Sequence, residues 1–139
     1  MRVVIYTSRA KRSFSTSEFS DLRDVAASTN HSLNITGLLL FDGNRFIQAL
    51  EGDAAAVQVV MDRIEKDPRH DSITYFDTIE TNYRQFNWWA TEYQNVSDSL
   101  NGKEFLERVK KHVADVKSDS IKAAFIGFAA LSLRRRLQA

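Results

Sequence analysis

Gln48 and Tyr6 are polar residues that stand inside predicted apolar strands, where each needs a partner. Alternation along the strand expected at 45–50 places Gln48 on the same face as Phe46. Burying its amide without partners would cost about 1–3 kcal/mol, so the fold must supply hydrogen bonds. Tyr6 lies in the strand expected at 3–7, and pairing of these two strands would bring its hydroxyl near the amide. The alternatives are a Gln48 amide bound to sheet backbone and a core Tyr6 with its hydroxyl at the sheet edge.

Two more candidate positions follow the predicted helices of this region. Asn30 stands where the first helix should end, a place where Asn commonly adopts the left-handed conformation. Asp67-Pro68 should stop the helix expected at 57–64. Arg69, which comes next, could hold a phosphate or a carboxylate.

The usual sequence signals of an enzyme are absent. The chain has no cysteine, no Gly-rich phosphate loop, no dinucleotide fingerprint and no nucleophile elbow. Its histidines, His31, His70 and His112, lack the spacing of metal ligands. Glu51 and Asp53 are close together, but an acidic pair in a turn is usually solvated and gives little support for a hydrolase. We therefore predict no catalytic and no metal-binding residues.

The composition is that of an ordinary globular domain. Of 139 residues, 43% are hydrophobic and 27% are charged, and the formal net charge is +1. This charge gives no reason to expect nucleic acid or an anionic membrane as the main partner. The apolar run 123–133 is shorter than the roughly 20 residues that a membrane-spanning helix needs. Because residues 1–6 lack a signal-peptide layout and cysteine is absent, we expect a cytoplasmic protein.

The periodicity predicts one domain with the element order β-α-β-β-α-β-β, followed by two helices. Strands are expected at 3–7, 35–41, 45–50, 72–79 and 86–96, and helices at 19–30, 57–64, 106–113 and 121–131. This order favours an α+β fold, a ferredoxin-like sandwich with a five-stranded mixed sheet and the first two helices on one face. The two C-terminal helices would cover the other face. Trp88 and Trp89 would point to opposite faces, and both are expected in the core.

Four short segments match one known pattern in residue type and spacing. They are Val4-Ile5-Tyr6-Thr7-Ser8-Arg9-Ala10, Asn30 followed by Asn34-Ile35-Thr36-Gly37-Leu38-Leu39-Leu40-Phe41, Phe46-Ile47-Gln48-Ala49-Leu50-Glu51-Gly52, and Asp67-Pro68-Arg69-His70. Together they resemble the BLUF family, the blue-light sensors that use FAD. The resemblance covers about residues 1–95. It implies that flavin, FAD or alternatively FMN, lies between the first two helices, with the C-terminal helices on the opposite face of the sheet.

The resemblance also implies a role for each matching residue. The Tyr6 hydroxyl would bond to Gln48, and Gln48 would contact the N5/O4 edge of the flavin ring. Asn30 would bond to the carbonyl and N3 side of the ring, and Phe46 would pack against it. The side chains that approach the ribityl and phosphate end would be Arg69 and His70.

The last predicted strand departs from the family pattern. The family commonly has Trp, one residue, and then Met; here Trp89 aligns with the Trp and Thr91 with the Met. These two residues share a strand face, and we count them with Tyr6 and Gln48 as the photochemical switch. A hydroxyl in place of a thioether would offer Gln48 or Tyr6 another hydrogen-bond partner.

The residue types suit the photochemistry that the resemblance implies. Excited flavin is a strong oxidant, and a neutral tyrosine can give up an electron while its proton leaves through a hydrogen-bonded neighbour. Gln48 would be that neighbour. Because an amide can exchange its donor and acceptor roles by rotation or tautomerisation, light would rearrange hydrogen bonds without net chemistry.

We thus expect a non-enzymatic photoreceptor made of a flavin-binding part, 1–96, and a C-terminal helical extension, 97–139, within one compact unit. The extension would serve output or oligomerisation. Partners would be flavin, a second copy of the chain and an unidentified downstream protein. The interface for this output would include Phe125, Phe128 and Leu131, or these residues would only cover the sheet. Two alternatives remain: a small ferredoxin-fold hydrolase of acyl phosphates, and a light-insensitive interaction module of the same fold.

Overall fold

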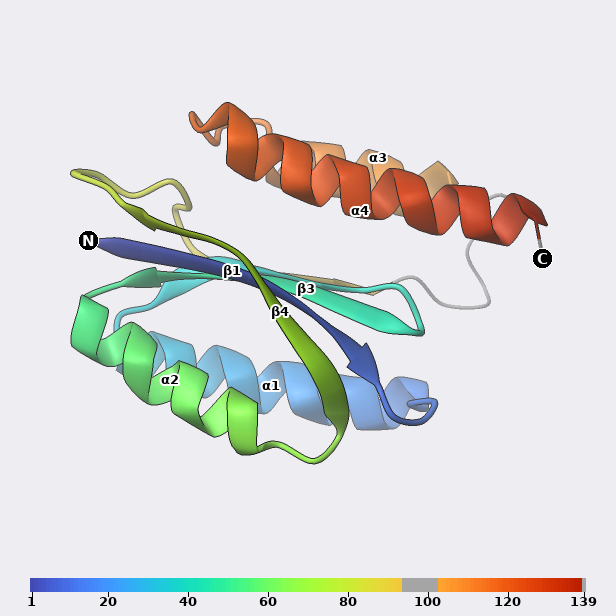
Figure 1. Ribbon diagram of the computed structural model, residues 1–139, viewed down its shortest axis with the longest axis horizontal. Helices are drawn as coiled ribbons and strands as arrows, with labels where there is room; N and C mark the ends of the chain where they lie inside the picture. Colours follow the sequence, from blue (N-terminus) through green and yellow to red (C-terminus); the bar gives the residue numbers. More distant parts are fainter. Residues whose placement is uncertain (94–102, 139) are drawn as a thin grey trace.

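The chain forms three layers, with a β-sheet between two pairs of helices (Figure 1). The computed structural model describes residues 1–93 and 103–138. Helices α1 and α2 cover one face of the sheet, and α3 and α4 cover the other. In chain order the elements are β1 (Arg2–Ala10), α1 (Thr16–Ser32), β2 (Thr36–Phe41), β3 (Arg45–Gly52), α2 (Ala54–Lys66), β4 (His70–Glu80), β5 (Trp89–Tyr93), α3 (Lys103–His112) and α4 (Asp119–Gln138). The predicted element order is confirmed.

The five strands form a mixed sheet in the order β4-β1-β3-β2-β5. All neighbouring strands are antiparallel except β2 and β5, which are parallel. The β2–β3 hairpin closes at the predicted Asp-Gly turn, where Asp42 Oδ1 accepts hydrogen bonds from the backbone N–H groups of Asn44 (2.9 Å) and Arg45 (2.7 Å). Gly43 adopts a positive φ of 98° in this turn. The ferredoxin-like α+β prediction is therefore confirmed.

Alternation along the two central strands divides the core between the two faces. Ile5 of β1 and Ile47 of β3 belong to the core shared with α3 and α4, which includes the fully buried Phe125. Their neighbours Tyr6 and Gln48 face α1 and α2 instead. The sheet thus presents one polar pair toward the first two helices.

Helix α1 starts and ends with clear local signals. Ser15 Oγ accepts a hydrogen bond from the Glu18 N–H (3.1 Å), and the Glu18 side chain accepts one from the Ser15 N–H (3.2 Å), which completes a capping box. The helix runs past Asn30, and the left-handed conformation expected there occurs instead at Asn34, with φ of 56°. Asn30 is therefore a helical residue whose side chain is not needed for the turn.

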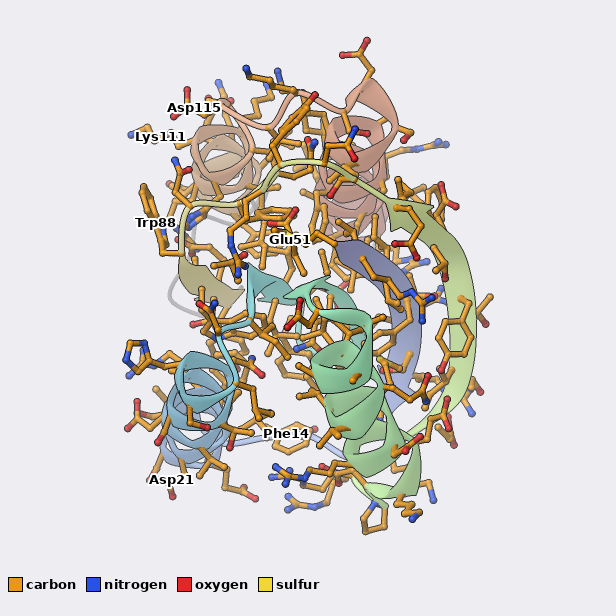
Figure 2. The ribbon with its side chains drawn as sticks, turned by 90° about the vertical axis from the view of Figure 1, so that its left-hand side faces the viewer. Phe14, Asp21, Glu51, Trp88, Lys111 and Asp115 are labelled. Carbon is orange, nitrogen blue, oxygen red and sulfur yellow. The ribbon has the colours of Figure 1, made fainter. Side chains whose placement is uncertain are left out.

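The last strand starts later than predicted, and this changes the position of one tryptophan. β5 covers Trp89–Tyr93, and positions 94–96 of the predicted strand lie outside the described residues. Trp88 precedes the strand, points outward in Figure 2 and is 64% exposed, so its expected core position is wrong. Strand alternation does not govern Trp88, because the residue belongs to the connection that enters β5.

The C-terminal helices provide the expected cover for the sheet. Phe125 is fully buried, Phe128 is partly buried and Leu131 is 51% exposed. Phe125 is thus sheet cover, and only the outer side of α4 remains available as a surface. Across residues 1–93 and 103–138, no helix combines the length and apolar character that crossing a membrane requires.

Candidate functional site

A cavity of about 270 Å³ lies between the sheet and helices α1 and α2. Its floor comes from β1, β2 and β3, through Tyr6, Leu39, Phe46 and Gln48. Its walls are largely apolar and come from both helices and the adjoining loops: Phe14, Leu22, Val25, Ala26, Val60 and Ile64. Figure 2 shows Phe14 between the two helices. The shape suits a flat aromatic molecule that slides between two helices above a sheet.

Tyr6 and Gln48 form a buried pair on the floor of this cavity. They stand directly opposite each other in the β1–β3 register, and the Tyr6 hydroxyl donates a hydrogen bond to Oε1 of Gln48. Tyr6 is 3% exposed and Gln48 is 5% exposed. Burial raises the pKa of the Tyr6 hydroxyl, and the nearby Asp67 and Tyr75 add to this effect. The phenol is therefore neutral and keeps its proton on the hydrogen bond to Gln48.

Two buried amides offer hydrogen bonds that the described protein does not use. Within residues 1–93 and 103–138, neither Nε2 of Gln48 nor the side chain of Asn30 has a hydrogen-bond partner, although both residues line the cavity. Asn30 is only 2% exposed and lies in the last turn of α1. Because these amides line the cavity and have no partner from the described protein, they are available to the polar edge of a ligand.

The mouth of the cavity carries the charged groups. Arg69 donates two hydrogen bonds to Asp67, from Nε to Oδ1 (2.9 Å) and from Nη2 to Oδ2 (2.5 Å). These hydrogen bonds hold the pKa of Asp67 below its ordinary value, so the pair stays ionised. Arg63 of α2 also lines the cavity. The predicted Arg69 therefore reaches the site, although its guanidinium already has a carboxylate partner.

His70 is held by the protein on both ring nitrogens. Nε2 lies 2.7 Å from the carbonyl oxygen of Ile64, and Nδ1 lies 2.7 Å from the hydroxyl of Ser8. A carbonyl oxygen only accepts, so Nε2 carries a hydrogen. His70 thus joins the end of α2 to β1 while its ring forms part of the cavity wall.

Trp89 and Thr91 do not line the cavity. Across the sheet, Tyr6 stands opposite Gln48, Gln48 opposite Leu39, and Leu39 opposite Thr91. Two strand spacings of about 4.8 Å therefore separate Thr91 from Gln48, too far for a direct hydrogen bond without movement of β5. Thr91 faces a separate groove beside α1. The structure thus brings together six predicted site residues, Tyr6, Asn30, Phe46, Gln48, Arg69 and His70, and leaves these two apart.

Trp89 packs beside Gly37, the residue opposite it on β2, and against the apolar clusters on the α1/α2 side. Its Nε1 is buried and has no hydrogen-bond partner among the described residues. The side chain therefore lies on the α1/α2 side of the sheet, and β2 separates its strand from β3, the strand of Gln48.

Several cavity residues were not predicted from the sequence. Phe14 belongs to the loop before α1, where no periodicity marks a functional side chain. Val25 did carry a signal, because it follows the apolar spacing of α1 yet is 66% exposed. An apolar helix stripe that meets no protein indicates a space for a ligand. Ser8, which does not line the cavity, lies just past the strand expected at 3–7, but β1 extends to Ala10 and places the Ser8 hydroxyl against His70.

Comparison with known proteins agrees with this geometry. A family model described as sensors of blue-light using FAD matches residues 1–92. The solved structure of BlrP1 BLUF, from a Klebsiella pneumoniae protein, is 26% identical with a TM-score of 0.70. That alignment covers 94% of this chain and 86% of the other chain.

Two curated relatives share about half of this chain. The blue light- and temperature-regulated antirepressor BluF of Escherichia coli K12 is 32% identical over 73 residues, which cover 52% of this chain and 18% of the relative. The beta subunit of photoactivated adenylate cyclase from Euglena gracilis is 36% identical over 74 residues, which cover 53% of this chain and 9% of the relative. The match thus spans less than a fifth of either relative. Because the family model covers well over half of the chain, the protein belongs to the BLUF family, the sensors of blue light that use FAD.

Proposed function

We propose that this chain is a blue-light photoreceptor in which Tyr6 and Gln48 form the light-driven switch and the C-terminal helices carry the signal to a partner. The observation that supports this proposal most is the neutral, buried Tyr6 hydroxyl bonded to an amide whose nitrogen is unpaired at a cavity. The free amide nitrogen can therefore meet a ligand in the cavity while the amide oxygen stays bonded to Tyr6.

The cavity residues fit FAD in their chemistry. Unpaired amides of Asn30 and Gln48 supply donors and an acceptor for the polar edge of a flavin ring, and Phe46 supplies an aromatic surface. Arg63 and Arg69 at the mouth suit the anionic phosphates. FMN shares the ring and one phosphate, so the same residues would accept it.

The protein's part in the photochemistry is to hold and move one proton. When bound, FAD supplies a light-excited ring that accepts an electron. Tyr6 would supply that electron while its Oη proton moves along the existing hydrogen bond toward Oε1 of Gln48, and the return of both to Tyr6 would leave no net oxidation or reduction. Burial makes this coupled route the favourable one, because a phenol buried here does not lose its proton alone. A Gln48 amide that exchanges its donor and acceptor atoms would then hold a second hydrogen-bond pattern.

An absorption experiment tests the proposal. The flavin-loaded chain is measured in the dark, directly after blue illumination and during recovery. We expect a small red shift of the flavin bands that reverses in the dark. Gln48→Leu should keep the bound flavin, because Leu fills similar space, but lose the shift. A colourless chain that cannot be loaded with flavin, or a Gln48→Leu variant with an unchanged shift, would reject the mechanism.

The output part of the proposal rests on α3 and α4. We propose 1–96 as the flavin-binding part and 97–139 as the output or oligomerisation part, signalling through a second copy or a downstream protein. The hydrolase hypothesis is not favoured, because Asn30 lies at the C-terminal end of its helix and not at a helix N-terminus, where an anion would bind.

A further inference from the structure

Glu51 is a fully buried carboxylate at the end of β3, three residues after Gln48. It lies on the α3/α4 side of the sheet (Figure 2). Oε2 accepts a hydrogen bond from the Gln85 N–H (2.6 Å), and Oε1 accepts from the Phe86 N–H (2.9 Å) and the Thr36 hydroxyl (3.0 Å). The expectation that this carboxylate is solvated is therefore wrong. Both carboxyl oxygens accept hydrogen bonds from the backbone of the loop between β4 and β5.

The same loop holds the start of α4. Gln85 is only 8% exposed, and its Oε1 accepts hydrogen bonds from the backbone N–H groups of Lys117 (3.2 Å) and Ser118 (2.9 Å), the two residues before α4. Phe86 packs edge-on against Phe125 of α4, with ring centroids 6.2 Å apart. One short loop thus binds β3 by its backbone and α4 by two side chains.

Arg84 fastens this loop to the start of β2 as well. Its Nη1 donates to the Thr36 hydroxyl (2.8 Å), and its Nη2 donates to the carbonyl oxygen of Asn34 (2.9 Å). These bonds hold the loop against the start of β2, while its bonds to Glu51 hold it against β3. Because Gln48 and Glu51 are separated by about 10 Å of one continuous strand, a displacement of β3 at Gln48 reaches Glu51 through rigid backbone.

We propose that Glu51, Gln85 and Phe86 form a clasp through which β3 sets the position of the first turns of α4, with Gln85 as the positioning residue. This inference rests on the proposed light switch at Gln48. A movement of β3 can reach α4 through the clasp without rearranging the buried core, because the loop between β4 and β5 contacts β3 on one side and α4 on the other. Light would alter α4 by shifting the balance between two arrangements of this loop.

The test is amide hydrogen exchange of residues 119–129 in the flavin-loaded full chain, in the dark and under continuous blue light. Light should change the exchange rate of this segment about fivefold or more, the size of an ordinary coupling between sites. Gln85→Met keeps the volume of the side chain but removes the acceptor oxygen. It should bring the ratio of lit to dark rates close to one while the flavin spectral shift remains. A merely structural role would alter both rates equally and keep their ratio.

Two further variants control the experiment. Gln85→Glu keeps an acceptor oxygen and should restore the ratio. Ser132→Ala removes another buried bond of α4, from its hydroxyl to Oδ2 of Asp42 (2.6 Å), and should leave the ratio unchanged. If Gln85→Met does not fold, Gln85→Asn, which withdraws the oxygen by one methylene, gives the same readout.

Each contrary result has a separate meaning. A normal spectral shift with no light-induced change in α4 exchange would reject the clasp. So would a Gln85→Met variant that keeps the wild-type ratio of lit to dark exchange rates. Neither result would contradict the proposed photoreceptor function. Absence of any spectral shift in the unaltered chain would reject the photoreceptor and the clasp together.

Discussion

Some residues of the cavity should contribute to FAD binding rather than to the stability of the flavin-free fold, and Asn30 is the clearest case. Its buried amide has no hydrogen-bond partner among the described residues, so it contributes nothing to the flavin-free fold that would offset its burial. We predict that Asn30→Leu weakens FAD binding about tenfold, the loss of roughly 1.4 kcal/mol. The same substitution should not lower the free energy of unfolding of the flavin-free chain.

Equilibrium dialysis with FAD and urea unfolding of the flavin-free protein measure the two effects of Asn30→Leu. Gln58→Ala, which removes a side chain bonded to Asp62 on the outer face of α2, is the control. Unchanged FAD affinity in Asn30→Leu would show that the amide does not contact the ligand. A large loss of flavin-free stability would show that it has a structural role.

Tyr6 should give the protein a specific response to alkaline pH. Burial raises the pKa of its hydroxyl above the ordinary value of 10.0, so the folded chain holds this proton more tightly than the unfolded chain. The contribution of Tyr6 to the free energy of unfolding is complete below pH 10 and is lost as the pH rises toward the folded-state pKa of its hydroxyl. Between pH 9 and pH 11, the free energy of unfolding should therefore fall more in the wild type than in Tyr6→Phe. Parallel curves in urea titrations would contradict this.

Sequence patterns predicted the residues that act locally and failed for those that depend on distant partners. Strand alternation and topology allowed Tyr6 and Gln48 to meet, and the family resemblance implied their bond; the β1–β3 register places them opposite each other. Glu51 could not be placed, since its donors at 85 and 86 lie in a loop without periodicity, 34 and 35 positions along the chain. The predicted core position of Trp88 was wrong for the same reason, because the start of β5 is set by pairing with β2 rather than by its own sequence.

At the scale of elements, β2 depends on a glycine. Gly37 has φ of 153°, and a Cβ atom there would lie 1.9 Å from the carbonyl oxygen of Ala49 on β3. Gly37→Ala should destabilise the fold by about 2 kcal/mol or more, because backbone cannot yield as a flexible side chain does. Urea unfolding measures this.

Gly127→Ala is the matched control for Gly37→Ala. Gly127 lies inside α4, and a Cβ atom there would meet nothing within 4 Å. Alanine favours the helix over glycine by about 0.5–1 kcal/mol, so this variant should be more stable than the wild type. Equal losses in the two variants would mean that the close approach of β2 and β3 is not what requires Gly37.

The contact between α3 and β5 should depend on acid. Glu92 of β5 accepts hydrogen bonds from Arg108 Nε (2.7 Å) and pairs with His112 Nε2 (2.8 Å). Burial alone would raise the pKa of Glu92, but the bonds from His112 and Arg108 outweigh it and hold the pKa below 4.5. The contribution of Glu92 to the free energy of unfolding is thus present above pH 4.5 and is lost as the pH falls through the folded-state pKa of its carboxyl.

Between pH 7 and pH 3, the urea midpoint of the wild type should fall more than that of Glu92→Gln. Glu107→Gln is the control, because Glu107 forms an exposed pair with Lys110 on α3. Its pH dependence should match the wild type. An identical acid response in Glu92→Gln would show that α3 is held to the sheet by its apolar face alone.

At the scale of the whole molecule, the sheet makes the two helical layers interdependent. One face of β1 and β3 forms the floor of the cavity, and the other face packs on α3 and α4 with fully buried aromatic residues such as Phe105 and Phe125. A strand cannot lose one of its faces and keep the other in place, because both faces share the same backbone. The flavin site and the C-terminal helices should therefore unfold in one cooperative transition.

Phe125→Ala tests this coupling, because Phe125 touches only the side of the sheet opposite the cavity. The cavity left in the core should cost about 3–5 kcal/mol. In urea, release of FAD and loss of helical circular dichroism should move together to a lower concentration. Leu131→Ala, at a 51% exposed position of the same helix, should change the free energy of unfolding by less than about 0.5 kcal/mol. If Phe125→Ala lost helical signal first and kept FAD to the wild-type midpoint, the flavin-binding part would fold independently, and a light signal could not reach α4 through the sheet.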